Sequence, residues 1–114
     1  MEFAFRGPTT LRNGTLVRAQ NHGFLVHMIV LIGARNLTLA DARELKTLLR
    51  AGKDRQAMKI GTTFFSLLNP ASPVAFQQQV LDTKPGYYVE ACFEDTQDHR
   101  EHTELNMLRV IKVV

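Results

Sequence analysis

The chain has 114 residues, of which 45% are hydrophobic and 22% are charged, and its formal net charge is +3. This length predicts a single domain over residues 1–114 with one hydrophobic core. The charge excess is too small to predict a nucleic-acid partner by itself. The longest apolar run contains His27 and Gly33 and falls short of the roughly 18–20 residues that span a bilayer, so no membrane insertion is expected.

The first third of the chain has the pattern of β-strands. Residues 2–6 alternate in polarity, and Asn13 and Gly14 form a tight-turn signal before residues 16–20. This arrangement predicts a hairpin across that turn. Residues 24–32 are rich in β-branched and aromatic side chains and apolar on both faces, which predicts a central strand.

A helix is predicted over about residues 39–51. Thr38 is a good N-cap, Asp41 lies three residues later as its capping-box partner, and Gly52 is a plausible stop. Leucines at helical spacing give it one apolar face, which we expect to pack on the outside of the sheets (Leu45, Leu48, Leu49).

The rest of the chain again resembles strands separated by turns. Asn69 to Pro73 is expected to break one strand from the next, and residues 83–86 form another turn. The expected strands are 62–68, 74–82, 87–93 and 107–114. About seven short strands with one inserted helix predict an all-β fold, a two-sheet antiparallel β-sandwich.

The segment between the last two predicted strands contains an unusual set of side chains. Cys92, His99, His102 and Met107 lie within sixteen positions of one another, and Cys92 is the only cysteine. It therefore cannot form an intramolecular disulfide and must be a buried apolar residue, a reactive thiol or a metal ligand. A thiolate, an imidazole and a thioether suit copper better than calcium or magnesium. Such a site needs a second histidine from elsewhere in the chain.

The order of these residues resembles the cupredoxins, the plastocyanin-like and azurin-like blue copper domains. The last strand pair begins with "PGYYVEAC", which ends at Cys92 and has Tyr88 at the family's tyrosine position; His102 then stands five residues before Met107. After an Asn-x-Gly turn, His27 stands where the family has its first histidine ligand. Because the four-residue gap before the methionine fits His102, it is favoured over His99.

The resemblance implies a Greek-key β-sandwich that holds one type 1 copper ion. Its ligands would be His27, Cys92, His102 and Met107, and the protein would carry single electrons rather than act as an enzyme. Many family members have Asn or Glu after the first histidine, where this chain has Met28, so a hydrogen bond that orients the site is expected to be missing. The family also implies a periplasmic or secreted location, although the N-terminus lacks the pattern of a secretory signal.

The charge distribution suggests what kind of partner would dock. Residues 93–104 carry five acidic side chains against Arg100 alone, whereas residues 35–59 carry seven basic and three acidic side chains. With His102 as the port for the electron, the acidic segment would favour a redox partner with a basic docking surface. The sequence predicts no oligomeric state.

Three alternatives remain open from the sequence. The chain can be a cupredoxin-like module that binds no metal and serves in interaction or structure. It can also store or deliver copper without a fast redox cycle. A Cys92–histidine nucleophile is chemically feasible, but the alternating strand lacks the helix N-terminus or glycine-rich turn that usually activates such a thiol.

Overall fold

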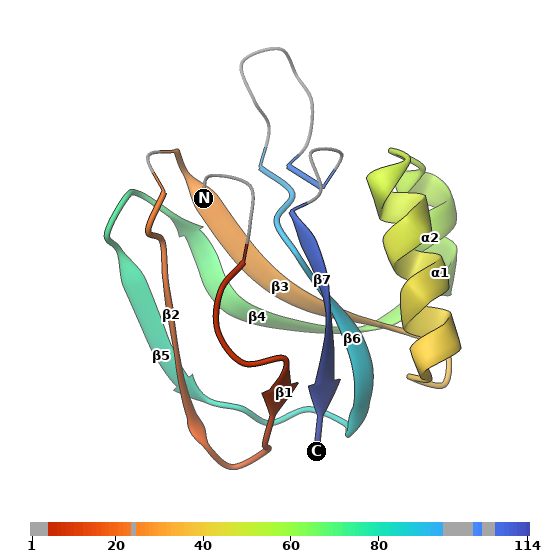
Figure 1. Ribbon diagram of the computed structural model, residues 1–114, viewed down its shortest axis with the longest axis horizontal. Helices are drawn as coiled ribbons and strands as arrows, with labels where there is room; N and C mark the ends of the chain where they lie inside the picture. The colour runs from red at the N-terminus through yellow and green to blue at the C-terminus, as the bar shows by residue number, and fades with distance from the viewer. Residues whose placement is uncertain (1–4, 24, 95–101, 104–106) are drawn as a thin grey trace.

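The computed structural model describes residues 5–23, 25–94, 102–103 and 107–114. Five strands form one sheet in the order β1-β7-β6-β3-β4, and two strands form a second sheet, β2-β5 (Figure 1). The strands are β1 (Thr10–Leu11), β2 (Leu16–Gln20), β3 (His27–Ala34), β4 (Gly61–Ala71), β5 (Phe76–Val80), β6 (Gly86–Ala91) and β7 (Leu108–Val113), and the helices are α1 (Leu39–Arg50) and α2 (Asp54–Ile60). The predicted two-sheet β-sandwich with an inserted helix is confirmed.

Strand β3 is central, as its sequence predicts, because β4 and β6 both pair with it antiparallel. Successive side chains point to opposite faces of a strand, so neighbouring residues enter different cores. Leu31 belongs to the core between the two sheets, and Ile32 belongs to the core beneath the helices. The pairing of β3 with β6, which is not its neighbour in sequence, gives the non-sequential order of a Greek-key sandwich.

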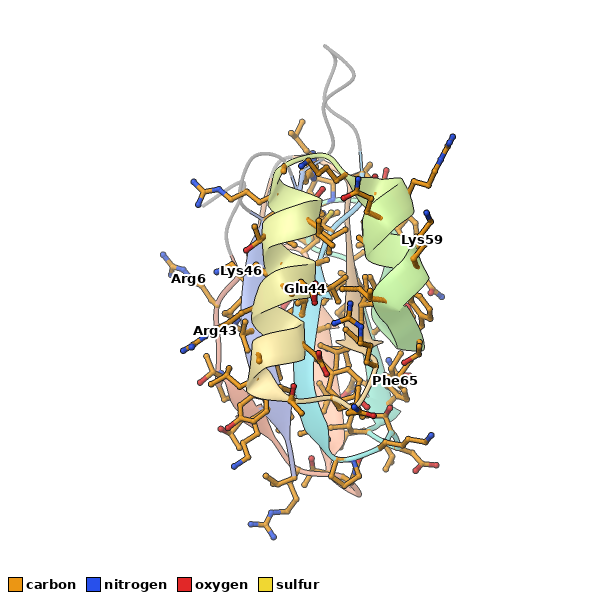
Figure 2. The ribbon with its side chains drawn as sticks, turned by 90° about the vertical axis from the view of Figure 1, so that its right-hand side faces the viewer. Arg6, Arg43, Glu44, Lys46, Lys59 and Phe65 are labelled. Atoms are coloured by element: carbon orange, nitrogen blue, oxygen red, sulfur yellow. The ribbon has the colours of Figure 1, made fainter. Side chains whose placement is uncertain are left out.

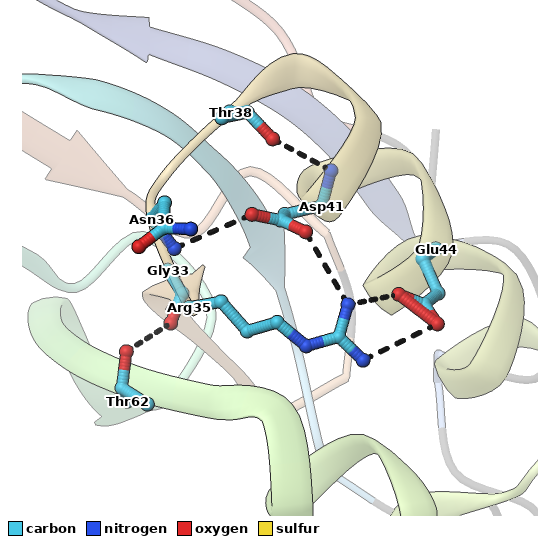
Figure 3. Close-up of polar contacts among 7 residues, drawn as sticks. All are labelled: Gly33, Arg35, Asn36, Thr38, Asp41, Glu44 and Thr62. Carbon is cyan, nitrogen blue, oxygen red and sulfur yellow. Dashed lines mark hydrogen bonds and ion pairs between the residues drawn. The ribbon is translucent and has the colours of Figure 1, made fainter.

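The helices cover the outer face of the five-stranded sheet, as predicted for α1, and Arg43, Lys46 and Lys59 project from them (Figure 2). The hydroxyl of Thr38 accepts a 3.1 Å hydrogen bond from the N–H of Asp41, which confirms the predicted cap (Figure 3). At the other end the N–H groups of Gly52 and Lys53 bond to carbonyls of the last turn, with Gly52 at φ 73°. Leu45 and Leu49 are fully buried.

Helix α2 was not predicted from the sequence. It has seven residues, its N-cap Lys53 makes no side-chain capping bond, and Ala57 is its one buried residue. A short helix without a cap or an apolar stripe has little local signal, and packing against α1 and β4 stabilises it instead.

The hairpin predicted across Asn13 and Gly14 is wrong. The turn exists, with Gly14 at φ 83°, but β1 pairs parallel with β7 and β2 pairs antiparallel with β5. The side chain of Asn13 bonds the carbonyl of Thr83 at 2.6 Å and the N–H of Thr83 at 3.0 Å. The turn is thus anchored to the β5–β6 connection and carries the chain from one sheet to the other. Of the strand expected over residues 2–6, only 5 and 6 are described, and neither is in a strand.

The break predicted at residues 69–73 begins later than expected, since β4 continues through Pro70 to Ala71. Strand β4 is an edge strand, where a proline need not donate a ladder hydrogen bond. Tyr88 forms a tyrosine corner like those of other β-sandwiches: its hydroxyl donates to the carbonyl of Lys84 at 2.6 Å, and the residue is fully buried. None of the described helices is both long and apolar enough to cross a bilayer.

Candidate metal centre

Three side chains from distant parts of the chain meet at one end of the sandwich. Nδ1 of His27 lies 3.1 Å from Nδ1 of His102, and Sγ of Cys92 lies 3.3 Å from the His102 nitrogen and 3.8 Å from the His27 nitrogen. All three side chains are buried, with exposed fractions of 3% or less. The structure therefore brings together three of the four residues that the cupredoxin resemblance names, with their donor atoms facing one another.

His27 is positioned by its place at the start of β3. It pairs with Ala71 of β4, and the loop before it is organised by Asn21, a buried polar residue. The amide of Asn21 donates to the carbonyls of Leu25 and Ala71 at 2.7 and 2.9 Å, and its oxygen accepts from the N–H of Gly23 at 2.9 Å. One side chain thus fixes the loop to the neighbouring strand. From the sequence alone, this stretch is recognisable only as a turn signal.

Cys92 follows β6 directly, which places its sulfur on the same face of the strand as Tyr88 and Glu90. The backbone N–H of Met28 donates a hydrogen bond to Sγ at 3.3 Å. The chain lacks the Asn or Glu side chain that many cupredoxins have at position 28. The sulfur nevertheless accepts a hydrogen bond from the backbone N–H at that position. Such a bond does not depend on which side chain occupies the position.

Burial is the main influence on the Cys92 thiol. Desolvation raises the pKa of Cys92 above its usual value, and the hydrogen bond from Met28 lowers it only in part. In the metal-free protein the thiol is accordingly protonated at neutral pH. A thiol of this kind is a poor nucleophile, which argues against the Cys–His nucleophile left open by the sequence.

His102 and Met107 are joined through the backbone. The N–H of His102 donates to the carbonyl of Glu94 at 2.8 Å, and the carbonyl of His102 accepts from the N–H of Met107 at 2.9 Å. Met107 is 4% exposed and, with His27, lies in the wall of a cavity at the side of the sandwich. His99 lies outside the described residues, and His22 is exposed in the turn before β3.

The donor triangle has the size that a first-row metal ion requires. With sides of 3.1, 3.3 and 3.8 Å, a point equidistant from the three atoms lies about 2.0 Å from each, close to the roughly 2.0–2.3 Å at which zinc binds imidazole nitrogen and thiolate sulfur. Two imidazoles and a thiolate in a trigonal arrangement are the donor set of blue copper sites. The residues present therefore fit a copper ion.

An ion pair between a buried carboxylate and a partly exposed guanidinium was not predicted from the sequence. Glu90 and Arg109 are directly opposite each other on β6 and β7, and Nε and Nη2 of Arg109 lie 3.1 and 2.9 Å from Oε1 of Glu90. Glu90 is 5% exposed. The pair could be found from the sequence only with the register of the two strands in hand.

Comparisons with known proteins add little to this geometry. No protein-family model matches the chain, and no curated protein matches it. Among solved structures the chain is similar to auracyanin B, with 18% sequence identity and a TM-score of 0.47 over 98% of this chain and 81% of that one. The candidate metal centre therefore rests on the chain's own residues.

Proposed function

We propose that this protein binds one copper ion through His27, Cys92, His102 and Met107 and carries single electrons between redox partners. The observation that carries the proposal is the convergence of two imidazole nitrogens and one thiol sulfur in a buried triangle. Bound there, copper would supply a one-electron couple between its Cu(I) and Cu(II) states.

Each residue of the candidate site would have a separate role. Cys92 would lose its proton on metal binding, and the Met28 N–H, already directed at the sulfur, would stabilise the resulting thiolate. His27 would be fixed by the central strand β3, and His102 by its backbone bonds to Glu94 and Met107. A site held in this way would change little between oxidation states, which favours fast electron transfer.

The charges near the candidate site and the cupredoxin resemblance bear on the redox partner and on the location of the protein. The acidic side chains of residues 93–104, which include Glu94, favour a redox partner with a basic docking surface. Because exposed charges are screened, this association would weaken as salt is raised. A periplasmic or secreted location accords with the cupredoxin resemblance.

The proposal is tested by adding Cu(II) to the reduced, metal-free protein and recording its visible spectrum. An intense blue or green thiolate-to-copper band is expected for the wild type and for His22→Ala, a control in an exposed turn histidine. Cys92→Ala should lack the band. If the wild type gives no band and keeps no copper after dialysis, the proposal fails and the metal-free interaction module stands.

A second measurement separates an electron carrier from a protein that stores or delivers copper. Voltammetry of the copper-loaded wild type should show a reversible one-electron couple. Copper that is bound tightly but is not reduced and reoxidised reversibly would favour storage or delivery.

A further inference from the structure

A cavity of about 910 Å³, open to solvent, lies at the side of the sandwich beside β1 and β2. Its walls include Leu67 and Leu68 of β4 on one side, Val17 and Ala19 of β2 on another, and the N-terminal segment 5–8. β1 and β2 follow each other in the chain but belong to different sheets (Figure 1). The two-stranded sheet is too narrow to cover the whole five-stranded sheet, and the cavity lies where the cover is missing. This volume falls in the roughly 300–1,000 Å³ range of ligand pockets.

The wall contains one buried carboxylate, and only one of its two oxygens is bonded within the part of the chain that the structure describes. Glu90 lies in the wall, and both of its contacts with Arg109 involve Oε1. Oε2 makes no hydrogen bond to any part of the chain that the structure describes. Arg109 directs its other donors to the carbonyls of Gly7 and Pro8, at 2.8 and 3.4 Å. The ion pair therefore presents the cavity with a spare acceptor rather than a spare donor.

The charges of the wall limit what can bind there. Arg6, Arg12 and Arg18 contribute to the wall together with Arg109, against the single carboxylate of Glu90. A cation would be repelled by this excess of positive charge, and an anionic group beside Oε2 would be repelled by Glu90 itself. A neutral hydrogen-bond donor on an apolar body satisfies both the acceptor and the apolar wall.

We propose that this cavity binds a small, neutral, apolar molecule that carries one hydroxyl group, of the class of the alkylphenols, with the hydroxyl donating to Oε2 of Glu90. The apolar body lies against apolar side chains of the wall, among them Val17, Leu67 and Leu68. The cavity also reaches His27 and Met107, so a bound molecule lies beside two residues of the candidate metal centre. Binding itself requires no metal.

The first test compares four ligands of similar size by calorimetric titration of the metal-free protein. Para-propylphenol is expected to bind saturably with one site. Para-propylanisole lacks the hydroxyl hydrogen and should bind at least about tenfold more weakly, the loss expected for a hydrogen bond to a charged group. Para-propylbenzoate and para-propylbenzylamine should also bind more weakly. Absence of saturable phenol binding, or equal binding of the phenol and the anisole, would overturn the proposal.

The second test fills the cavity from β2. Ala19→Phe and Val17→Phe each place a ring in the wall and should weaken para-propylphenol binding by at least about tenfold, as expected when apolar contact area is lost. Ala51→Phe adds the same side chain at the exposed end of α1 and should leave binding unchanged. Thermal unfolding checks that each variant folds, and the ligand series on the wild type needs no variant. Unchanged binding in a folded Ala19→Phe variant would place the ligand elsewhere. Because both tests use metal-free protein, failure of the copper site would not affect them.

Discussion

The Nδ1 atoms of His27 and His102 lie 3.1 Å apart although 75 residues separate them in the chain. At this distance the two nitrogens share either one hydrogen or one metal ion. Removal of His102 should therefore abolish tight copper binding and the thiolate band. His99→Ala is the matched variant, because His99 is the other histidine between Cys92 and Met107. We expect His99→Ala to keep the band; a band that survives in His102→Ala and disappears in His99→Ala would reassign the ligand.

Met107 is expected to tune the copper site rather than to create it. In Met107→Leu the two histidines and Cys92 remain, so the thiolate band and the bound copper should be retained. Replacing the thioether by an apolar side chain should raise the reduction potential, because the axial ligand and the apolarity of the site tune it and more apolar surroundings disfavour the more highly charged Cu(II). Voltammetry of the variant, with Met58→Leu on the exposed face of α2 as a control, measures the shift. An unchanged potential in Met107→Leu would exclude Met107 as a ligand.

The Glu90–Arg109 pair should matter for stability mainly when it is broken on one side. Arg109→Leu leaves the Glu90 carboxylate buried without its partner, and such a change costs about 3–5 kcal/mol in the free energy of unfolding. The double variant Glu90→Leu/Arg109→Leu removes both charges and should recover most of that loss. Urea denaturation of the two variants and the wild type measures both effects. A double variant no more stable than Arg109→Leu would show that the bonds of Arg109 to the N-terminal segment matter more than the pair.

Gly86 is required by close packing as well as by its backbone conformation. Its φ of 150° is unfavourable for other residues, and an added Cβ would lie 2.5 Å from Cβ and 2.9 Å from the carbonyl oxygen of Leu37. Gly14 also has a positive φ, of 83°, but has open space around it. Gly14→Ala should cost about 1 kcal/mol in unfolding free energy, and Gly86→Ala about 1–3 kcal/mol more. Equal losses in denaturation would mean that the Leu37 loop moves aside without cost.

Features with a local signal were predicted well. Thr38 and Gly52 mark the two ends of α1, because a capping residue and a glycine in the left-handed conformation act within one turn of the helix. The apolar run of β3 marks a central strand, because both faces of that strand are buried. The turn at Asn13 and Gly14 was also recognised. Its strands were assigned to the wrong partners, since pairing depends on residues such as Thr83 that lie far away in the sequence.

In the candidate site, too, some features have a local sequence signal and others depend on contacts between distant residues. The candidate ligands Cys92, His102 and Met107 were recognised from their side-chain types and from the cupredoxin resemblance. The approach of His27 depends on the bond from the Asn21 side chain to Ala71 and on the pairing of β3 with β4, whereas the sequence shows Asn21 only as part of a turn signal. The backbone donor at Met28 cannot be read from a residue name, because every residue except proline carries that N–H.

The positions of the three donor atoms also set how a bound ion would leave. Cys92 and His102 are ten residues apart, but His27 is 65 residues from Cys92 and lies at the head of the central strand. An ion that joins all three would close long loops in the chain, and this entropic constraint disfavours the unfolded ensemble. Fraying at the ends of the chain would leave the ion held, because β3 opens only when its pairing with β4 and β6 is lost. The rate at which a chelator extracts the ion would then report the opening of the sandwich as a whole.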